Sequence, residues 1–182
     1  LQTLDSASDS LKKQSGTFSE VSGNYGFSYD KRNRTFMPTD GSIIGFNQSL
    51  PIYADKSFIA NTLSVSSYKT LSENYIGSAK ALFTAINGLG SDDVRISKRR
   101  SLSSKKLRGF EKGKVGPLDG NDFIGGNFVS AINLSSTIPQ ILENSENIDV
   151  AVFFDAANVW GVDYDSSLDN NRIRSSVGLG ID

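Results

Sequence analysis

Apolar and polar residues alternate along several stretches of the chain. Within residues 18–29, Val21, Tyr25, Phe27 and Tyr29 occupy odd positions, and the even positions between them carry serine, asparagine or glycine. Successive side chains of a β-strand point to opposite faces of its sheet. This period of two therefore predicts strands with one apolar and one polar face.

The same pattern, with weaker windows included, predicts about seven strands of roughly 9–13 residues each. They are residues 18–29, 41–50, 57–68, 75–87, 122–134, 147–157 and 172–182. Short turns are expected at 38–41 and 51–56, and one long connection from about residue 88 to residue 121. We expect these strands to form one antiparallel up-and-down meander with little helix, in which each strand pairs with its neighbour in sequence.

The amino-acid composition favours a sheet that turns one face to lipid and the other to water, rather than the core of a soluble globular domain. Hydrophobic residues make up 37% of the 182 residues, whereas a globular domain typically has roughly 45–50%. The strongest apolar run is Val150–Phe154, far short of the roughly 18 residues of a membrane-spanning helix. The predicted fold class is therefore all-β, a partial antiparallel transmembrane β-barrel with short periplasmic turns and a longer external loop.

Several kinds of chemistry are not expected. The chain has no His and no Cys, which removes the usual Ser-His-Asp and Cys-His nucleophilic sites and the commonest zinc ligands. Asp119–Asp122 lacks the ligand ladder of a calcium loop and is interpreted as a turn. The net charge of −1 gives no bulk reason to expect nucleic acid. We predict no catalytic residue, no metal, no cofactor and no enzyme activity.

A basic cluster lies within the long connection. Lys98, Arg99, Arg100, Lys105 and Lys106 follow one another closely. The cluster is compatible with a solvated loop and, alternatively, with contact to lipopolysaccharide or nucleic acid.

Four motifs follow one another in a fixed order. The first is Tyr25–Asp30 with Phe36–Gly41, and the second is Leu107-Arg108-Gly109-Phe110. Gly116-Pro117 and Gly120–Asn127, which includes Gly125 and Gly126, come next, followed by Phe153–Trp160. In this order and near this spacing, the motifs resemble those of the BamA family of outer-membrane protein assembly factors, over about residues 18–182.

The resemblance implies a function. It implies a bacterial outer-membrane barrel that helps to fold and insert other β-barrels, with unfolded outer-membrane proteins as clients. Expected partners also include outer-membrane lipid, lipopolysaccharide and accessory lipoproteins bound through periplasmic domains. The whole chain, 1–182, is interpreted as one partial barrel domain; the periplasmic domains and the final strand are expected to lie outside it.

The sequence departs from the family pattern at two places. Residues 98–104 replace the aromatic residues and paired glycines that often precede the loop motif, and Ser135 stands where many members carry a lumen-facing Glu. In the family, the arginine of the loop motif meets acidic residues of the inner wall. We therefore expect Arg108 to reach into the lumen and pair with Asp155, assisted by Gly109 and Phe110.

The faces of the strands follow from the alternation. Val21, Tyr25, Phe27, Val150, Val152, Phe154, Val177, Leu179 and Ile181 are predicted to face lipid. Ser22, Asn24, Asp149, Asp155, Arg172 and Arg174 are predicted to face the lumen.

Other classes of protein remain open at this stage. A related barrel, such as a TamA-like autotransporter assembly factor or a two-partner secretion pore, would differ in its upstream periplasmic domains. A soluble all-β binding domain would be monodisperse without detergent.

Overall fold

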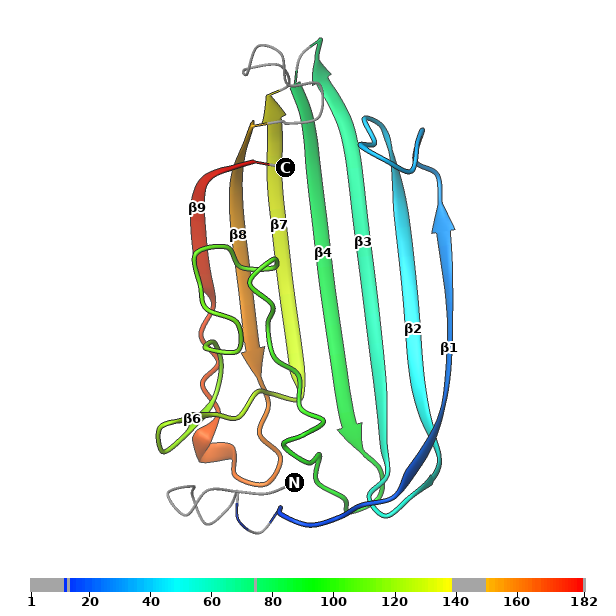
Figure 1. Cartoon of the computed structure of the whole chain (residues 1–182), viewed down its shortest axis with the longest axis vertical. Helices are drawn as coiled ribbons and strands as arrows, with labels where there is room; N and C mark the ends of the chain where they lie inside the picture. Colours follow the sequence, from blue (N-terminus) through cyan, green and yellow to red (C-terminus); the bar gives the residue numbers. More distant parts are fainter. Residues whose placement is uncertain (1–11, 13, 74, 139–149, 182) are drawn as a thin grey trace.

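A seven-stranded antiparallel sheet dominates the computed structural model (Figure 1). The structure describes residues 12, 14–73, 75–138 and 150–181. The long strands are β1 (Glu20–Asp30), β2 (Gly41–Ala54), β3 (Phe58–Ser72), β4 (Tyr75–Gly88), β7 (Phe128–Ile138), β8 (Val150–Trp160) and β9 (Arg174–Ile181). They lie in the order β1-β2-β3-β4-β7-β8-β9, and each pairs antiparallel with its neighbour, so the predicted meander is confirmed.

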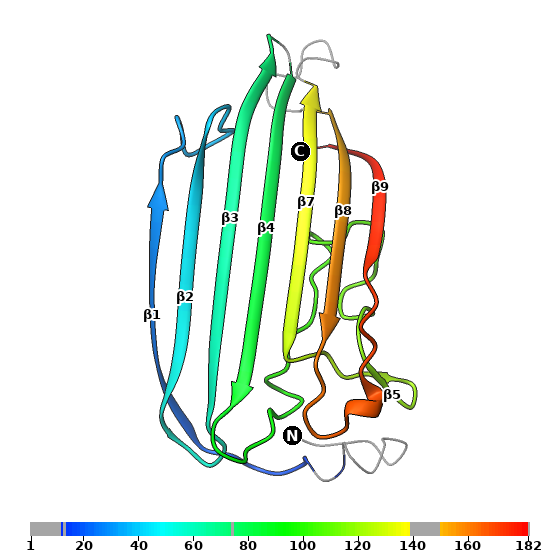
Figure 2. The ribbon, with the colours of Figure 1, turned by 180° about the vertical axis from the view of Figure 1, so that it is seen from behind.

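The long connection between β4 and β7 lies against one face of the sheet. It crosses β7, β8 and β9, as the opposite views in Figures 1 and 2 show. We call the face that carries this loop the inner face and the opposite one the outer face. The sheet is not closed, because β1 and β9 are its two ends.

The strand expected at 122–134 begins later than predicted. Residues 122–123 belong to β6 (Asp122–Phe123), which forms a small hairpin with β5 (Leu118–Asp119), and the wall strand β7 begins only at Phe128. Gly120 and Gly125 both have positive φ angles, 62° and 67°, and such a backbone interrupts a strand. The segment 122–127 is therefore part of the loop.

β2 is longer than its predicted window. The expected turn at 51–56 is wrong for its first residues, because the strand continues through Pro51 to Ala54. The register with β1 shifts between Val21 and Ser22, opposite Pro51 and Tyr53. An irregularity of this kind accommodates a proline, which cannot donate to the ladder.

The buried core lies between the inner face and the loop. Leu102, Leu107 and Val115 of the loop pack against Val129, Ala131, Ala157 and Val159 of β7 and β8. Leu82 and Phe110 are partly buried against the same cluster. The core is thus built from a wall and its loop rather than from two sheets.

The outer face carries exposed apolar side chains. Val152 is opposite Leu179, and Phe154 is opposite Val177; all four point away from the loop, and Val177 and Leu179 are each 76% exposed. Val21, Tyr25 and Phe27 are exposed as well. Asp149 and the side chain of Ile181 lie outside the described part of the chain.

One predicted inner-wall residue is not in a strand. Arg172 precedes β9 and donates its backbone N–H to the carbonyl of Asn170, 2.8 Å away. The predicted strand therefore starts two residues too early, because β9 begins only at Arg174.

Candidate functional site

The loop motif lies against the inner face of β7 and β8. Leu107 is fully buried in the core cluster, and Phe110 packs against the same cluster. Gly109, between Arg108 and Phe110, has a φ angle of +84°, a conformation that glycine adopts without strain. The turn thus directs Leu107 into the core and Arg108 towards β8.

Arg108 is held by Asp155, a residue of β8. Its backbone N–H donates to Oδ2 of Asp155 at 3.0 Å, its Nε donates to the same oxygen at 2.8 Å, and its Nη2 donates to Oδ1 at 2.7 Å. The Asp155 side chain is completely buried, whereas that of Arg108 is 29% exposed. The two parallel side-chain bonds form the fork that an arginine makes with a carboxylate.

Asn133 of β7 completes the set of donors to Asp155. Its Nδ2 lies 2.8 Å from Oδ1 of Asp155 and 2.9 Å from the carbonyl oxygen of Lys106. Asn133 and Asp155 are direct register partners. One amide therefore joins the wall carboxylate to the loop backbone, a contact that the sequence alone did not indicate.

Phe153, two residues before Asp155 on β8, supplies a second contact for Arg108. The guanidinium carbon lies 3.6 Å from the centroid of the Phe153 ring. An arginine over an aromatic face gains electrostatic attraction as well as contact. Arg108 therefore has both a charge partner and a stacking partner on the same strand.

Ser135 lines a cavity beside this site, and its side chain supplies a hydroxyl group rather than a carboxylate. Its hydroxyl is 2.7 Å from that of Ser78 on β4. A cavity of about 530 Å³ opens here, lined by Lys80, Ser104, Lys105, Lys106, Arg108, Asn133 and Ser135. Burial, with a smaller effect from the charge of Lys80, lowers the pKa of Lys106.

A second set of contacts holds the base of the loop. Arg99, whose side chain is fully buried, pairs with Asp163 in the β8–β9 connection. Asp163 also accepts from the backbone N–H of Val94 at 2.7 Å and from Nδ2 of Asn127 at 3.0 Å. The guanidinium of Arg99 lies 4.8 Å from the centroid of the Tyr164 ring. No sequence motif indicated Asp163.

The same turn of the loop also reaches β1. Nζ of Lys98 is 2.7 Å from Oε2 of Glu20, and Nη2 of Arg95 is 3.9 Å from that oxygen. Lys98 N–H donates to the carbonyl of Arg95, and Arg99 N–H donates to it too. The turn therefore connects one end of the sheet to the β8–β9 connection. The interpretation of the basic cluster as a solvated loop is wrong for Arg99, whose side chain is fully buried, whereas Lys98 is paired with Glu20 and remains 35% exposed.

At the motif glycines, the loop backbone passes close to neighbouring parts of the chain. A Cβ on Gly116 would lie 2.9 Å from the side chain of Val159. Gly126 exchanges two backbone hydrogen bonds with Arg100, at 2.8 and 2.9 Å. Gly125 has a φ angle of +67° beside the same bridge. The glycines thus let the loop backbone lie against the end of the wall.

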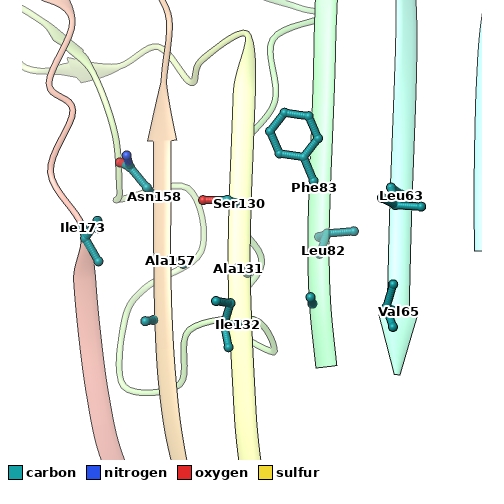
Figure 3. A pocket seen from close by; sticks show the side chains of 12 residues that line it. Leu63, Val65, Leu82, Phe83, Ser130, Ala131, Ile132, Ala157, Asn158 and Ile173 are labelled. Carbon is teal, nitrogen blue, oxygen red and sulfur yellow. The ribbon is translucent and has the colours of Figure 1, made fainter. Parts of the chain in front are cut away.

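A shallow hollow marks the outer face. It has a volume of about 200 Å³ and is lined mainly by apolar side chains, among them Leu63, Phe83, Ile132 and Ile173 (Figure 3). No charged side chain lines it. It offers apolar surface and no catalytic group.

The described ranges, residues 12, 14–73, 75–138 and 150–181, hold neither a metal-binding cluster nor a helical membrane span. They contain no group of three or more acidic side chains arranged to hold a metal ion. No helix in those ranges is long and apolar enough to cross a membrane.

Comparison with known proteins points to one family. The Omp85 superfamily domain matches residues 2–182. The SAM50-like protein of Schizosaccharomyces pombe is 27% identical over 144 residues, covering 73% of this chain and 30% of that protein. The sorting and assembly machinery component 50 homolog of Homo sapiens is 27% identical over 138 residues, covering 73% of this chain and 29% of that protein.

The structural comparison agrees. The crystal structure of BamA from Haemophilus ducreyi lacking POTRA domains 1–3 matches with a TM-score of 0.78 and 25% identity, over 87% of this chain and 35% of that one. The chain thus spans about a third or less of the proteins it resembles.

Proposed function

Because the chain belongs to the Omp85 superfamily, we propose that it is part of the barrel of a factor that inserts β-barrel proteins into an outer membrane. Its fold matches the BamA barrel, and SAM50 proteins are relatives. The observation that carries the proposal is the loop motif held by Asp155 on the inner face of a BamA-like sheet. A soluble all-β binding domain is set aside because the family match extends over residues 2–182.

The two faces of the sheet support a place in a membrane. The outer face exposes large apolar side chains such as Phe27, Phe154 and Leu179, whereas the inner face carries Asn133, Asp155 and Lys80. A barrel in lipid needs this division, since lipid covers one side only. We place the protein in the outer membrane of a bacterium, with lipid and lipopolysaccharide around the outer face.

The activity we propose requires no bond-breaking chemistry. An incoming client strand would pair with an exposed strand edge of the barrel, using its main-chain hydrogen bonds. The described residues would contribute wall and docked loop to that process. Unfolded outer-membrane proteins would be the clients, and accessory lipoproteins would bind periplasmic domains of the whole protein.

A reconstitution experiment tests this function. The full-length protein is placed in lipid vesicles, and the folding of an unfolded β-barrel client is followed by its protection from protease. We expect folding to be faster than in protein-free vesicles. A client folding rate equal to that of protein-free vesicles would contradict the proposal.

Related roles give different results in the same system. A TamA-like factor would accelerate autotransporter barrels and leave other β-barrel clients unaffected. A two-partner secretion pore would export a soluble partner and would not change the folding rate of any barrel client.

A further inference from the structure

A glycine of β9 lies directly beneath the aromatic ring that supports Arg108. Gly178 is the register partner of Phe153. A Cβ built on Gly178 would lie 2.8 Å from Cζ and 3.1 Å from Cε1 of that ring. Real Cβ atoms do not approach other atoms so closely, so only glycine fits this position while the ring stays in place.

The reason for glycine here is steric. Gly178 is not among the glycines with positive φ, so its backbone conformation is open to other residues. What excludes a side chain is the ring. An aromatic side chain that covers a cross-strand glycine fills the space that a side chain would otherwise occupy.

The ring cannot easily move away. The guanidinium of Arg108 lies 3.6 Å from the ring centroid, and only 9% of Phe153 is exposed. Arg108 in turn is fixed by three hydrogen bonds to Asp155. The Phe153 ring therefore lies close both to the Gly178 position of β9 and to the Arg108 guanidinium.

Gly180, the next inner-face residue of β9, differs from Gly178. A Cβ there would lie 3.8 Å from the Phe153 ring and 4.0 Å from Nη1 of Arg108, which is ordinary contact. A side chain at Gly178 would thus collide with the Phe153 ring, whereas a side chain at Gly180 on the same strand would not.

We propose that Gly178 is a positioning residue, which couples the pairing of β9 to the docking of the loop through Phe153. When β9 is seated, Phe153 is held under Arg108; when Arg108 is docked, Phe153 is held over β9. Coupling of this kind is reciprocal, so loosening either partner loosens the other by the same factor. Because β9 is an end strand of the described sheet, the loop motif would control how firmly that strand is paired.

Hydrogen exchange measures the coupling in both directions. In the full-length protein in detergent or lipid, Arg108→Ala should speed exchange of the β9 amides at least about fivefold, the lower end of ordinary coupling. Lys105→Ala, at an exposed loop position lining the neighbouring cavity, is the matched control and should leave β9 unchanged. Unchanged β9 exchange in Arg108→Ala would overturn the proposal.

The opposite direction uses the loop as the reporter. The Arg108 backbone N–H is itself bonded to Asp155, so its exchange rate reports docking. Gly178→Ala should raise this rate at least about fivefold, and Gly180→Ala should have little effect. Equal effects of the two substitutions would contradict the steric argument.

A second substitution separates positioning from general damage. Phe153→Leu added to Gly178→Ala makes room for the new methyl group, so protection of β9 should return. Protection of the Arg108 N–H should not return, because the flat surface under its guanidinium is gone. If Gly178→Ala alone fails to fold and the double variant also fails, the collision with Phe153 is not the cause and the proposal falls. None of these measurements depends on the insertion activity.

Discussion

Arg108 and Asp155, 47 residues apart in sequence, are joined by one backbone and two side-chain hydrogen bonds. The Asp155 carboxylate is fully buried, and the Arg108 side chain is 29% exposed. A planar guanidinium facing both carboxylate oxygens permits little rotation. The loop motif is therefore fixed to β8 in orientation as well as in position.

The first prediction concerns this pair. Arg108→Ala and Asp155→Asn should each destabilise the loop in the full-length protein, because each removes one of the two paired charges. Breaking a fully buried pair costs about 3–5 kcal/mol, and the exposed part of Arg108 should reduce this. A double-mutant cycle on denaturant unfolding measures the coupling. The double variant should be little worse than either single one, and additive losses would contradict the pairing.

The second prediction concerns the base of the loop. Asp163→Asn keeps the size of the side chain but leaves the fully buried Arg99 without its carboxylate. We expect loss of up to about 3–5 kcal/mol of loop stability, seen as faster limited proteolysis within residues 95–126. Asp122→Asn, at an exposed position of the β5–β6 hairpin, is the control. Equal proteolysis of the two variants would show that Asp163 does not hold the loop.

Some of this arrangement could be predicted from the sequence because its cause is local. Alternation in residues such as Tyr25 and Phe27 comes from the strand geometry itself, so strands and their order were predicted correctly. The strand expected at 122–134 began too early. There, the apolar Phe123 and Ile124 belong to a loop whose backbone is turned by Gly120 and Gly125, and alternation alone does not reveal such turns.

The contacts of the site depend on residues far apart in the chain. The interaction of Arg108 with Asp155 was expected only through a resemblance in motif, since nothing in spacing alone relates the two. Asp163 and Glu20 belong to none of the sequence motifs. Their partners, Arg99 and Lys98, were visible as a basic cluster, but which carboxylate meets each depends on how the sheet curves and where the loop crosses it.

The third prediction tests the two faces. Leu63 on β3 points to the outer face and is 43% exposed, whereas its neighbour Ser64 points inward, towards the Gly45 carbonyl. In lipid, Leu63→Arg should destabilise the folded barrel by about 2–4 kcal/mol if it lies near the membrane centre, and Ser64→Arg should cost much less. Unfolding of the two variants in lipid vesicles provides the comparison. A larger loss for Ser64→Arg would reverse the assignment of faces.

The last prediction concerns Tyr164, in the connection before β9. Its hydroxyl donates to Oδ2 of the buried Asp119 at 3.2 Å. Burial first, and then the negative charge of Asp119, raises the pKa of Tyr164 from 10.0 to about 12. The raised value means that the folded state favours the protonated phenol. This contribution to stability is therefore fully present below pH 10 and is lost as the pH rises through about 12.

The titration of Tyr164 can be isolated by subtracting the curve of a variant that lacks its hydroxyl group. The ultraviolet absorbance of tyrosinate is recorded against pH for the folded wild type and for Tyr164→Phe, and the two curves are subtracted. We expect the difference to titrate near pH 12, the raised value for Tyr164. Tyr164→Phe should also be less stable at neutral pH by about 1 kcal/mol, since it lacks one hydrogen bond, and its stability should fall less between pH 10 and 12 than that of the wild type. A difference curve centred at the ordinary value for tyrosine would mean that Asp119 and the burial of the ring do not act on Tyr164, and that the β8–β9 connection is not packed against the loop hairpin in solution.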